Sequence, residues 1–360
     1  MKIAYLMRHD ITKNDGVTKK VLDQTTEWKK SGHTVQVFCY VYNKGKSIIV
    51  DANQYKIRPP LKNKFVLEND LLKDLEVFSP DVVYYRYSTL NRTLRKVLSK
   101  YKVVTEVNTD DLGESKLLWE KERNLKSFAR YFTYTLFRSQ ILKKVQGIIA
   151  VTKEIAELPS TTKYDKPTVY IPNGIDLEKY QTIKKYNEVY DRVGLFFIGS
   201  PNQPWHGVDI IEEMSKKLPQ YDFHIVGMEG DSSENLFWHG YLQKDEYLKI
   251  LKKCQICIGT LALERKNMKE ACPLKVREYL AYGYPTIIGY EDTAFLENDV
   301  DFILKLKGDK VSDEAINQIS HFVESEKGSV VSSELLNSIN SKELEQGRLS
   351  FMEDVILSKG

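Results

Sequence analysis

The sequence has few of the residues that cross-link small secreted proteins. Its 360 residues include only four cysteines, Cys39, Cys254, Cys257 and Cys272. Four cysteines make no disulfide framework in so long a chain, so we expect reduced thiols and a cytoplasmic protein. Cys254 and Cys257 have C-x-x-C spacing, but no second pair or nearby histidine pair completes a zinc site. We therefore interpret both as core thiols.

Long hydrophobic runs and a large net charge are absent too. The apolar run in the opening "MKIAYLMRHD" is too short for a signal peptide, and no stretch approaches the ~18 apolar residues of a membrane span. A formal net charge of only +3 gives no general attraction for nucleic acid. We therefore expect no transmembrane segment and no nucleic-acid partner.

Two common nucleotide-binding motifs are missing as well. No G-x-G-x-x-G follows any apolar run, and no P-loop occurs. A bound NAD or FAD cofactor is therefore not expected.

The chain does contain short, β-branched and continuous apolar runs, as buried parallel strands require. Helical patterns separate many of them, and this alternation predicts βαβ units. The predicted strands are 2–7, 34–41, 82–87, 102–107 and 147–152, then 193–200, 221–227 and 254–260, with helices at 17–31, 89–100, 207–217 and 244–253.

The alternation stops at the polar stretch 176–192 and then restarts. We therefore predict an α/β fold of two doubly wound, Rossmann-like domains, residues 1–171 and 172–340. The C-terminal helix, about 341–360, could pack on either half, and we assign it to the first. Ligands of such sheets bind beyond the carboxyl ends of the strands, which predicts a cleft between the two domains.

One predicted helix, within "KEACPLKVREYLAYGYPTII" (269–288), carries charges that have two interpretations. Pro273 suits its first turn and Gly283 its end. At ~100° per residue, Lys275 and Glu278 share the face opposite the apolar residues. They could form a solvated ion pair worth a few tenths of a kcal/mol. Alternatively, Lys275 and the helix N-terminus bind a phosphate, while Glu278 accepts hydrogen bonds from two ribose hydroxyls.

A second carboxylate, Glu270, lies eight residues before Glu278 and completes an E-x7-E pattern. With "YLAYGYPTII" after it, the pattern resembles the signature of retaining glycosyltransferases of GT-B architecture, particularly glycosyltransferase family 4. Three other segments resemble the same family in the same order. They are "PNGID" (172–176), "WHGVDIIEEM" (205–214) and "WHGYLQKDEYLKIL" (238–251).

The resemblance implies a hexosyltransferase-like enzyme that takes a sugar from a nucleotide-diphosphate donor with retention and needs no metal or other cofactor. Glu278 then binds the donor ribose and Glu270 lies near the transferred sugar, although Cys272-Pro273 replaces the usual glycine-bearing turn. The donor-binding residues that the resemblance implies are Asn173, Gly199, Ser200, His206, Pro273, Leu274, Lys275 and Glu278.

The chain departs from the family at two phosphate-binding positions. Ser200 stands where many relatives have Arg, and His206 where they have Lys. His206 offers at most one positive charge to the diphosphate, so the remaining positive charge must come from elsewhere, and Lys275 and Arg277 are the candidates. Alternatively, Trp205 and His206 only pack the loop.

Asn108 stands where family members often have a histidine that contacts the transferred sugar, with Glu106 and Glu114 nearby. Asn can hydrogen-bond a sugar but cannot act as an acid or base. We therefore assign Asn108 and Glu270 to the catalytic site and expect front-face displacement, in which the departing phosphate accepts the acceptor's proton.

Residues 8–20, "RHDITKNDGVTKK", contain a further family-like loop. Asp15, Gly16 and Val17 resemble the glycine-containing loop that touches donor phosphate and acceptor. The glycine could equally serve only as a turn.

The stretch 123–145 mixes basic and aromatic residues. The simpler interpretation is a helix that packs its aromatic side into the first domain. The other is an interfacial surface that brings the enzyme to a lipid-linked acceptor.

We conclude that the sequence predicts a retaining glycosyltransferase for a glycan or glycolipid acceptor in cell-envelope polysaccharide synthesis, cytoplasmic or peripheral on the inner membrane face. Two alternatives remain: a non-catalytic glycosyltransferase-like subunit and a nucleotide-sugar epimerase of the same architecture.

Overall fold

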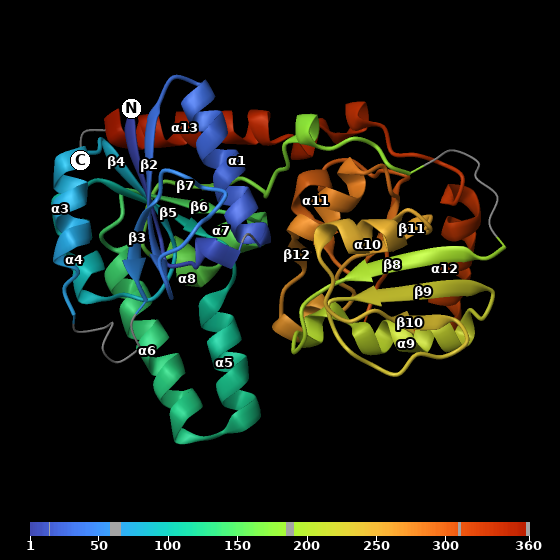
Figure 1. Cartoon of the computed structure of the whole chain (residues 1–360). Helices are drawn as coiled ribbons and strands as arrows, with labels where there is room; N and C mark the ends of the chain where they lie inside the picture. The colour runs from blue at the N-terminus through green and yellow to red at the C-terminus, as the bar shows by residue number, and fades with distance from the viewer. Residues whose placement is uncertain (14, 58–65, 185–190, 309–310, 358–360) are drawn as a thin grey trace. The chain divides into compact units, whose positions relative to one another are not determined.

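The computed structural model of the chain divides into two compact units (Figure 1). Unit 1 comprises Met1–Asn173 and Ser341–Gly360, and unit 2 comprises Gly174–Asn340. The structure describes residues 1–13, 15–57, 66–184, 191–308 and 311–357.

Unit 1 contains a seven-stranded sheet in the order β3-β2-β1-β4-β5-β6-β7, and each neighbouring pair is parallel. The strand order reverses between β1 and β4, which is the hallmark of a doubly wound sheet. The strands are β1 (Lys2–Met7), β2 (Thr34–Val41), β3 (Asn53–Lys56), β4 (Val82–Arg86), β5 (Val103–Val107), β6 (Gly147–Ala150) and β7 (Thr168–Tyr170).

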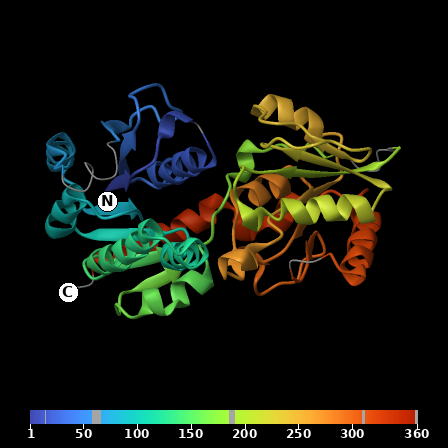
Figure 2. The same ribbon diagram turned by 90° about the horizontal axis from the view of Figure 1, so that it is seen from below.

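Helices cover both faces of this sheet (Figure 2). The C-terminal helix α13 packs against α1, so the two ends of the chain share one layer. The helices of unit 1 are α1 (Gly16–Lys30), α3 (Asn69–Phe78), α4 (Arg92–Lys100), α5 (Asp111–Glu122), α6 (Leu125–Leu142), α7 (Lys153–Glu157), α8 (Pro159–Thr162) and α13 (Ser341–Leu357).

Alternate residues of the central strands build the core beneath α1 and α13. Tyr5 of β1 stacks on Trp28 of α1 with ring centroids 5.7 Å apart, and Tyr84 of β4 meets the same indole edge-on at 4.9 Å. Leu349 and Met352 of α13 are fully or almost fully buried in this cluster. The short, continuous apolar runs thus form strands because both of their faces are covered.

Unit 2 repeats the arrangement with six parallel strands in the order β10-β9-β8-β11-β13-β15. Its order reverses between β8 and β11. The elements are β8 (Val193–Ile198), α9 (Val208–Lys217), β9 (Tyr221–Val226), β10 (Leu236–Trp238), α10 (Lys244–Leu251), β11 (Ile256–Ile258), α11 (Leu274–Ala281), β13 (Thr286–Ile288), β15 (Ile303–Lys305) and α12 (Asp313–Glu326), with a short pair β12 (Glu270–Ala271) and β14 (Glu291–Asp292).

The pleat of β8 divides the helices of unit 2 between two faces. Leu195 and Phe197 pack in one cluster with α9 and α12. Phe196 points the other way and meets Tyr279 of α11 edge-on at 5.9 Å. Cys254 and Cys257 are buried free thiols whose pKa values burial raises, which confirms the interpretation as core thiols.

The predicted α/β fold of two Rossmann-like domains is confirmed, and several strand predictions agree with the structure to within a residue or two. The short strands β3, β10 and β15 and the helices α3 and α12 were not predicted. Strands of three or four residues have too little periodicity to stand out from loop sequence. Part of the linker 176–192 lies outside the described residues.

Candidate functional site

Each unit has its own topological switch point, at the carboxyl ends of β1 and β4 in unit 1 and of β8 and β11 in unit 2. Ligands of doubly wound sheets bind at such points. The predicted site residues lie on loops and helix ends near these positions, and each unit is described separately below.

In unit 1, Asp15 caps the first turn of α1. Its carboxylate accepts hydrogen bonds from the Thr18 amide (3.1 Å) and from His9 (2.9 Å). Burial opposes ionisation of Asp15, but these bonds prevail and lower its pKa to about 2. Asp15 therefore fixes the helix start, and Gly16 and Val17 occupy its first turn, directly after the loop that follows β1.

Asn108 follows β5, and three side chains hold its amide group. Its oxygen accepts hydrogen bonds from Lys20 (3.2 Å) and Arg86 (3.0 Å). Its nitrogen donates to the Glu106 carboxylate at 3.1 Å. These contacts determine which way the amide of Asn108 faces.

Glu106 is completely buried at the end of β5 and pairs with three cations. Lys20 lies 2.8 Å from its carboxylate, Arg86 3.1 Å and Arg348 3.7 Å. Burial alone would raise the pKa of Glu106, but the three cations outweigh it and hold that pKa well below its ordinary value. Burial lowers the pKa of Lys20 to about 8, despite the attraction of Glu106.

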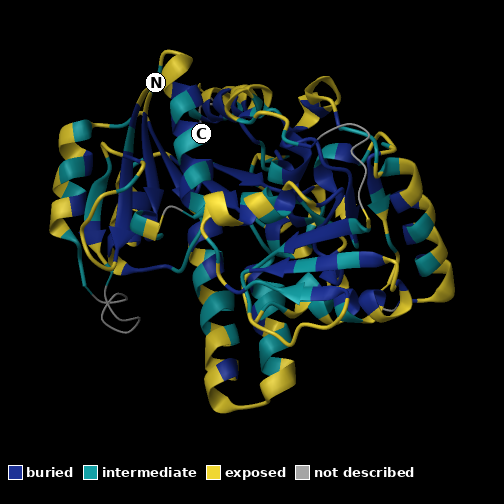
Figure 3. Ribbon diagram, turned by 45° about the vertical axis from the view of Figure 1, so that its right-hand side comes forward, coloured by how far each residue is buried: buried dark blue, intermediate teal, exposed yellow. Residues whose placement is uncertain are grey.

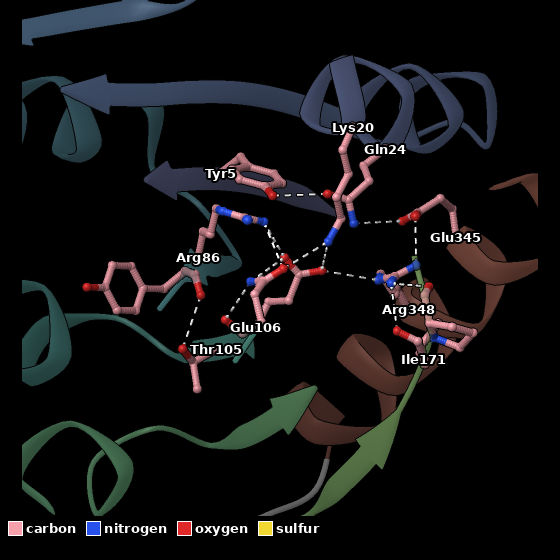
Figure 4. A network of polar contacts seen from close by, with 12 residues as sticks. Tyr5, Lys20, Gln24, Arg86, Thr105, Glu106, Ile171, Glu345 and Arg348 are labelled. Carbon is pink, nitrogen blue, oxygen red and sulfur yellow. Dashed lines mark hydrogen bonds and ion pairs between the residues drawn. The ribbon is translucent and has the colours of Figure 1, made fainter. Parts of the chain in front are cut away.

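Arg348 extends this network to the C-terminal helix and to the point where the chain leaves unit 1 (Figure 4). It donates to the carbonyls of Ile171 and Pro172, both at 2.9 Å, and to Glu345 at 2.7 Å. Glu345 in turn accepts a hydrogen bond from the Trp28 indole at 2.9 Å. Helix α13, the segment 171–172 and the end of β5 are therefore joined by one set of buried charges.

In unit 2, the loop after β8 packs so closely against its neighbours that Gly199 and Gly227 have no room for a side chain. A Cβ on Gly227, where φ is +96°, would lie 2.0 Å from the Gly199 carbonyl oxygen. A Cβ on Gly199 would lie 2.8 Å from His206 Nδ1. The glycines therefore allow His206 and the exposed Ser200 to lie near the end of β8.

His206 is half-buried and supplies no charge at neutral pH. Burial, and secondly the nearby Lys275, lower its pKa to about 3. Its ring meets Phe197 edge-on at 5.6 Å. The interpretation that His206 packs the loop agrees with this geometry, and a cationic role in place of the family's lysine does not.

Helix α11 begins directly after Pro273, and no side chain caps its first turn. Lys275 lies in that turn, partly buried, with its Nζ donating to the Ile198 carbonyl of β8 at 3.1 Å and lying 4.0 Å from the centre of the Phe197 ring. Among the described residues, no carboxylate lies within ion-pair distance of Lys275. Burial lowers the pKa of this uncompensated amine to about 7.

Arg277 was the other candidate for phosphate charge, and the structure excludes it. Its side chain is completely buried and forms a bidentate ion pair with Asp292, at 2.7 and 2.6 Å. That geometry uses the planar fork of the guanidinium fully. Lys275 is therefore the candidate that remains.

Glu278 does not pair with Lys275. It accepts a hydrogen bond from the Tyr247 hydroxyl at 3.1 Å and lies 3.7 Å from Lys244. Lys244 also lies over the ring of Tyr180 at 5.1 Å. The Glu278 side chain keeps 21% of its surface exposed, so further donors can reach its carboxylate.

The remaining predicted residues lie on adjoining segments. Glu270 is on β12, which pairs with β14 and ends two residues before Pro273. Leu274 is the first residue of α11. Asn173 is the last residue of the first segment of unit 1.

The sequence interpretation missed Lys20, Arg86, Tyr247 and Lys244, which hold the predicted side chains. Lys20 had a detectable signal, because it lies on the buried face of α1, beside Val21, where an apolar residue is expected. The others lie on segments whose partners only the folded chain brings close.

Within the described residues, no cluster of three or more His, Cys, Asp or Glu side chains is placed to hold a metal ion. In the same residues no helix has both the length and the apolar character for crossing a bilayer.

Comparison with known proteins gives a family match for part of the chain and a fold for almost all of it. Residues 14–179 match the model of Glycosyltransferase Family 4. No curated protein sequence matches. Three solved structures are similar over almost the whole chain, at identities that establish the fold alone. They are sucrose-phosphate synthase from Thermosynechococcus elongatus (12% identity, TM-score 0.65, 99% of this chain and 97% of that one), the lipopolysaccharide outer core galactosyltransferase WaaB (13%, 0.61, 98% and 100%), and an alpha-glucosyltransferase in complex with UDP-glucose and DNA (14%, 0.61, 99% and 99%).

We predict that Glu106→Gln lowers the free energy of unfolding of unit 1 by about 3 kcal/mol, because it leaves buried cations without their carboxylate. The folded-state pKa of Glu106 is depressed, so its stabilisation is present above the unfolded pKa near 4.5 and is lost as pH falls below it. The variant should therefore lose less stability than the wild type on acidification. Denaturant unfolding at pH 7 and pH 4 measures both effects.

Glu76→Gln is the matched control, because Glu76 pairs with Lys100 at 2.8 Å in an exposed position. This variant should leave the free energy of unfolding unchanged. Equal stabilities for Glu106→Gln and the wild type at pH 7 would contradict the role given to the buried carboxylate.

Proposed function

We propose that this chain, a glycosyltransferase of GT-B fold that carries a Glycosyltransferase Family 4 domain at residues 14–179, transfers a sugar with retention from a nucleotide-diphosphate donor to a glycan or glycolipid acceptor. Metal independence is part of the proposal. So is a role in cell-envelope polysaccharide synthesis.

The observation that carries the proposal is the separation of Lys275 from Glu278 on α11. Lys275, in the first turn, lies beside the end of β8, and no carboxylate of the described residues pairs with its amine. Glu278, nearly one turn later, has an accessible carboxylate held by Tyr247. A cation and an anion at this spacing suit the two parts of a nucleotide diphosphate, its phosphates and its ribose.

Stabilisation of the leaving diphosphate is the central chemical requirement, because negative charge grows on it as the glycosidic bond breaks. The uncapped N-terminus of α11 offers backbone amides, and Lys275 offers a charge. Glu278 would bind the ribose hydroxyls and so fix the donor's position. These are preorganised groups and need no metal.

We keep Glu270 and Asn108 as the candidate residues for the transferred sugar, each within its own unit. Asn108 can hydrogen-bond a sugar hydroxyl, but its amide does not titrate, so it cannot take the acceptor's proton. We therefore favour front-face displacement. The bond from the anomeric carbon to the donor phosphate breaks, the bond to the acceptor oxygen forms on the same face, and the proton passes to the departing phosphate.

The acceptor is proposed from fold-level analogy. The WaaB structure is that of a lipopolysaccharide galactosyltransferase, and another similar structure holds UDP-glucose. These two similar proteins favour a glycan or glycolipid acceptor and make UDP the first donor to test. The expected location, cytoplasmic with access to the inner membrane face, belongs to the same proposal.

The proposal is tested by nucleotide binding and turnover. We expect UDP or GDP to raise the melting temperature of the full chain, because a ligand that binds only the folded state stabilises it. Hydrolysis or transfer of the matching nucleotide sugar should persist in EDTA. A panel of nucleoside diphosphates that produces no shift would contradict the donor site, and a strict metal requirement would contradict metal independence.

We predict that Glu278→Ala weakens nucleotide diphosphate binding at least about tenfold, because hydrogen bonds to a carboxylate contribute about 1.5–3 kcal/mol each. Isothermal titration calorimetry measures the affinity. Glu213→Ala, at an exposed glutamate paired with Lys217, is the control and should bind as the wild type does. Unchanged affinity for Glu278→Ala in a folded protein would remove the ribose assignment.

Lys275 predicts a pH dependence of the same binding. Its pKa is about 7 in the empty site, and a bound diphosphate raises that pKa. Below pH 7 the amine is already charged. Above pH 7 binding must take up a proton, so affinity should fall by up to about tenfold per pH unit, until the pH reaches the pKa of the complex.

Calorimetry between pH 7.5 and 9, in two buffers of different ionisation enthalpy, measures both the fall in affinity and the proton uptake. Lys275→Arg keeps its charge throughout and should flatten the profile. Lys275→Met should bind weakly at every pH. A wild-type profile that is flat without proton uptake would contradict the phosphate role of Lys275.

A further inference from the structure

Helices α5 and α6 form a hairpin that projects from the sheet of unit 1 (Figures 1 and 3). Its base is anchored by Arg138, which is buried, pairs with Asp111 and donates to Thr161 at 3.2 Å. Its distal half holds together through aromatic contacts, with Trp119 stacked on Tyr131 at 5.6 Å and an interplanar angle of 9°. The hairpin therefore keeps its shape without covering the outer side of α6.

The outer side of α6 carries a row of exposed apolar side chains. Leu125, Phe128, Phe132 and Leu136 are 83%, 42%, 54% and 46% exposed. Their spacings of three, four and four residues place them on one stripe of the helix. The simpler sequence interpretation, in which the aromatic side packs inward, agrees with Tyr131 and in part with Phe128, whose ring meets Trp119 of α5 at 5.3 Å. Phe132 stacks on Phe128 at 6.3 Å and leaves about half of its surface exposed.

Basic side chains surround this row at the distal end of the hairpin. Lys121, Arg123, Lys126 and Arg130 are exposed. In the part of the chain that the structure describes, none of the four forms an ion pair with a carboxylate. Arg130 instead lies over the ring of Tyr134 at 5.6 Å. These four basic residues outnumber the exposed Glu120 and Glu122 beside them, so the distal end of the hairpin carries a net positive charge next to the apolar row.

We propose that the outer face of α6 and the basic end of the hairpin bind the surface of a bilayer that contains anionic lipids. Leu125, Phe128, Phe132 and Leu136 enter the boundary between headgroups and acyl chains, and the four basic residues contact the lipid headgroups. The helix lies on the bilayer and does not span it. The proposal rests on the proposed function only for its purpose, which is to bring the enzyme to a membrane-linked acceptor.

Charge favours a lipid surface over a second copy of this chain. In a symmetric dimer the same patch meets itself, so the basic residues of the two copies would face each other. An anionic bilayer supplies both the apolar phase and the opposite charge.

The test is co-sedimentation of the full chain with phosphatidylcholine vesicles, with and without phosphatidylglycerol. We expect binding only when phosphatidylglycerol is present, weakened by salt. The triple variant Leu125→Ser, Phe132→Ser, Leu136→Ser should lose binding at least about tenfold. The charge variant Lys126→Glu, Arg130→Glu should weaken it at least about fivefold per residue changed.

The matched control is Val77→Ser, Leu335→Ser, which removes exposed apolar side chains from elsewhere on the surface. It should bind vesicles as the wild type does. Circular dichroism and nucleotide binding verify that each variant is folded and that its donor site is intact.

Three outcomes would overturn the proposal. The wild type could ignore anionic vesicles, the triple variant could bind them equally well, or sedimentation velocity could show a dimer that only the triple variant breaks, without vesicle binding. Lost vesicle binding with intact nucleotide binding would refute this proposal alone. Vesicle binding by a wild-type chain that binds no nucleotide would refute the proposed function alone.

Discussion

The arrangement of unit 1 depends on the ion pairs that the buried carboxylate of Glu106 forms with three cations. A lone charge inside the core would be prohibitively costly, so its position requires partners from other elements. Lys20 comes from α1, Arg86 from β4 and Arg348 from α13. One side chain at the end of β5 thereby fixes two helices and orients Asn108. Its partner Arg348 donates to the carbonyls of Ile171 and Pro172, at which the chain leaves unit 1.

Helix α11 of unit 2 shows how neighbouring cations acquire different roles. Arg277 points into the protein and is neutralised by Asp292, so it contributes to structure. Lys275, two residues earlier, lies beside the end of β8 with a carbonyl and a ring as its partners. Burial without a counter-ion makes its charge costly, and an anionic ligand would relieve that cost. The same physics separates a structural cation from a candidate binding cation.

Much of the fold could be predicted because parallel strands buried on both faces leave a strong signal. Runs such as 2–7 and 34–41 are continuously apolar, and they agree with β1 and β2. Short strands at the sheet edges, such as β15, carry no comparable signal. The sequence left two interpretations of the hairpin α5–α6 open for a related reason. A periodic aromatic stripe shows that a helix has an apolar face, but it does not show whether that face is covered.

The sequence by itself determined the alternation of strands and helices and the two-domain plan, because these follow from local periodicity. The candidate residues Glu270 and Glu278 came from its resemblance to glycosyltransferase family 4. The tertiary structure alone decided what each polar side chain meets. It paired Arg277 with Asp292, placed no carboxylate of the described residues within ion-pair distance of Lys275, packed His206 against Phe197 and surrounded Asn108 with Lys20, Arg86 and Glu106. Such pairings join residues far apart in the chain, and the free energy of a charge depends on its burial and its neighbours, which no local pattern records.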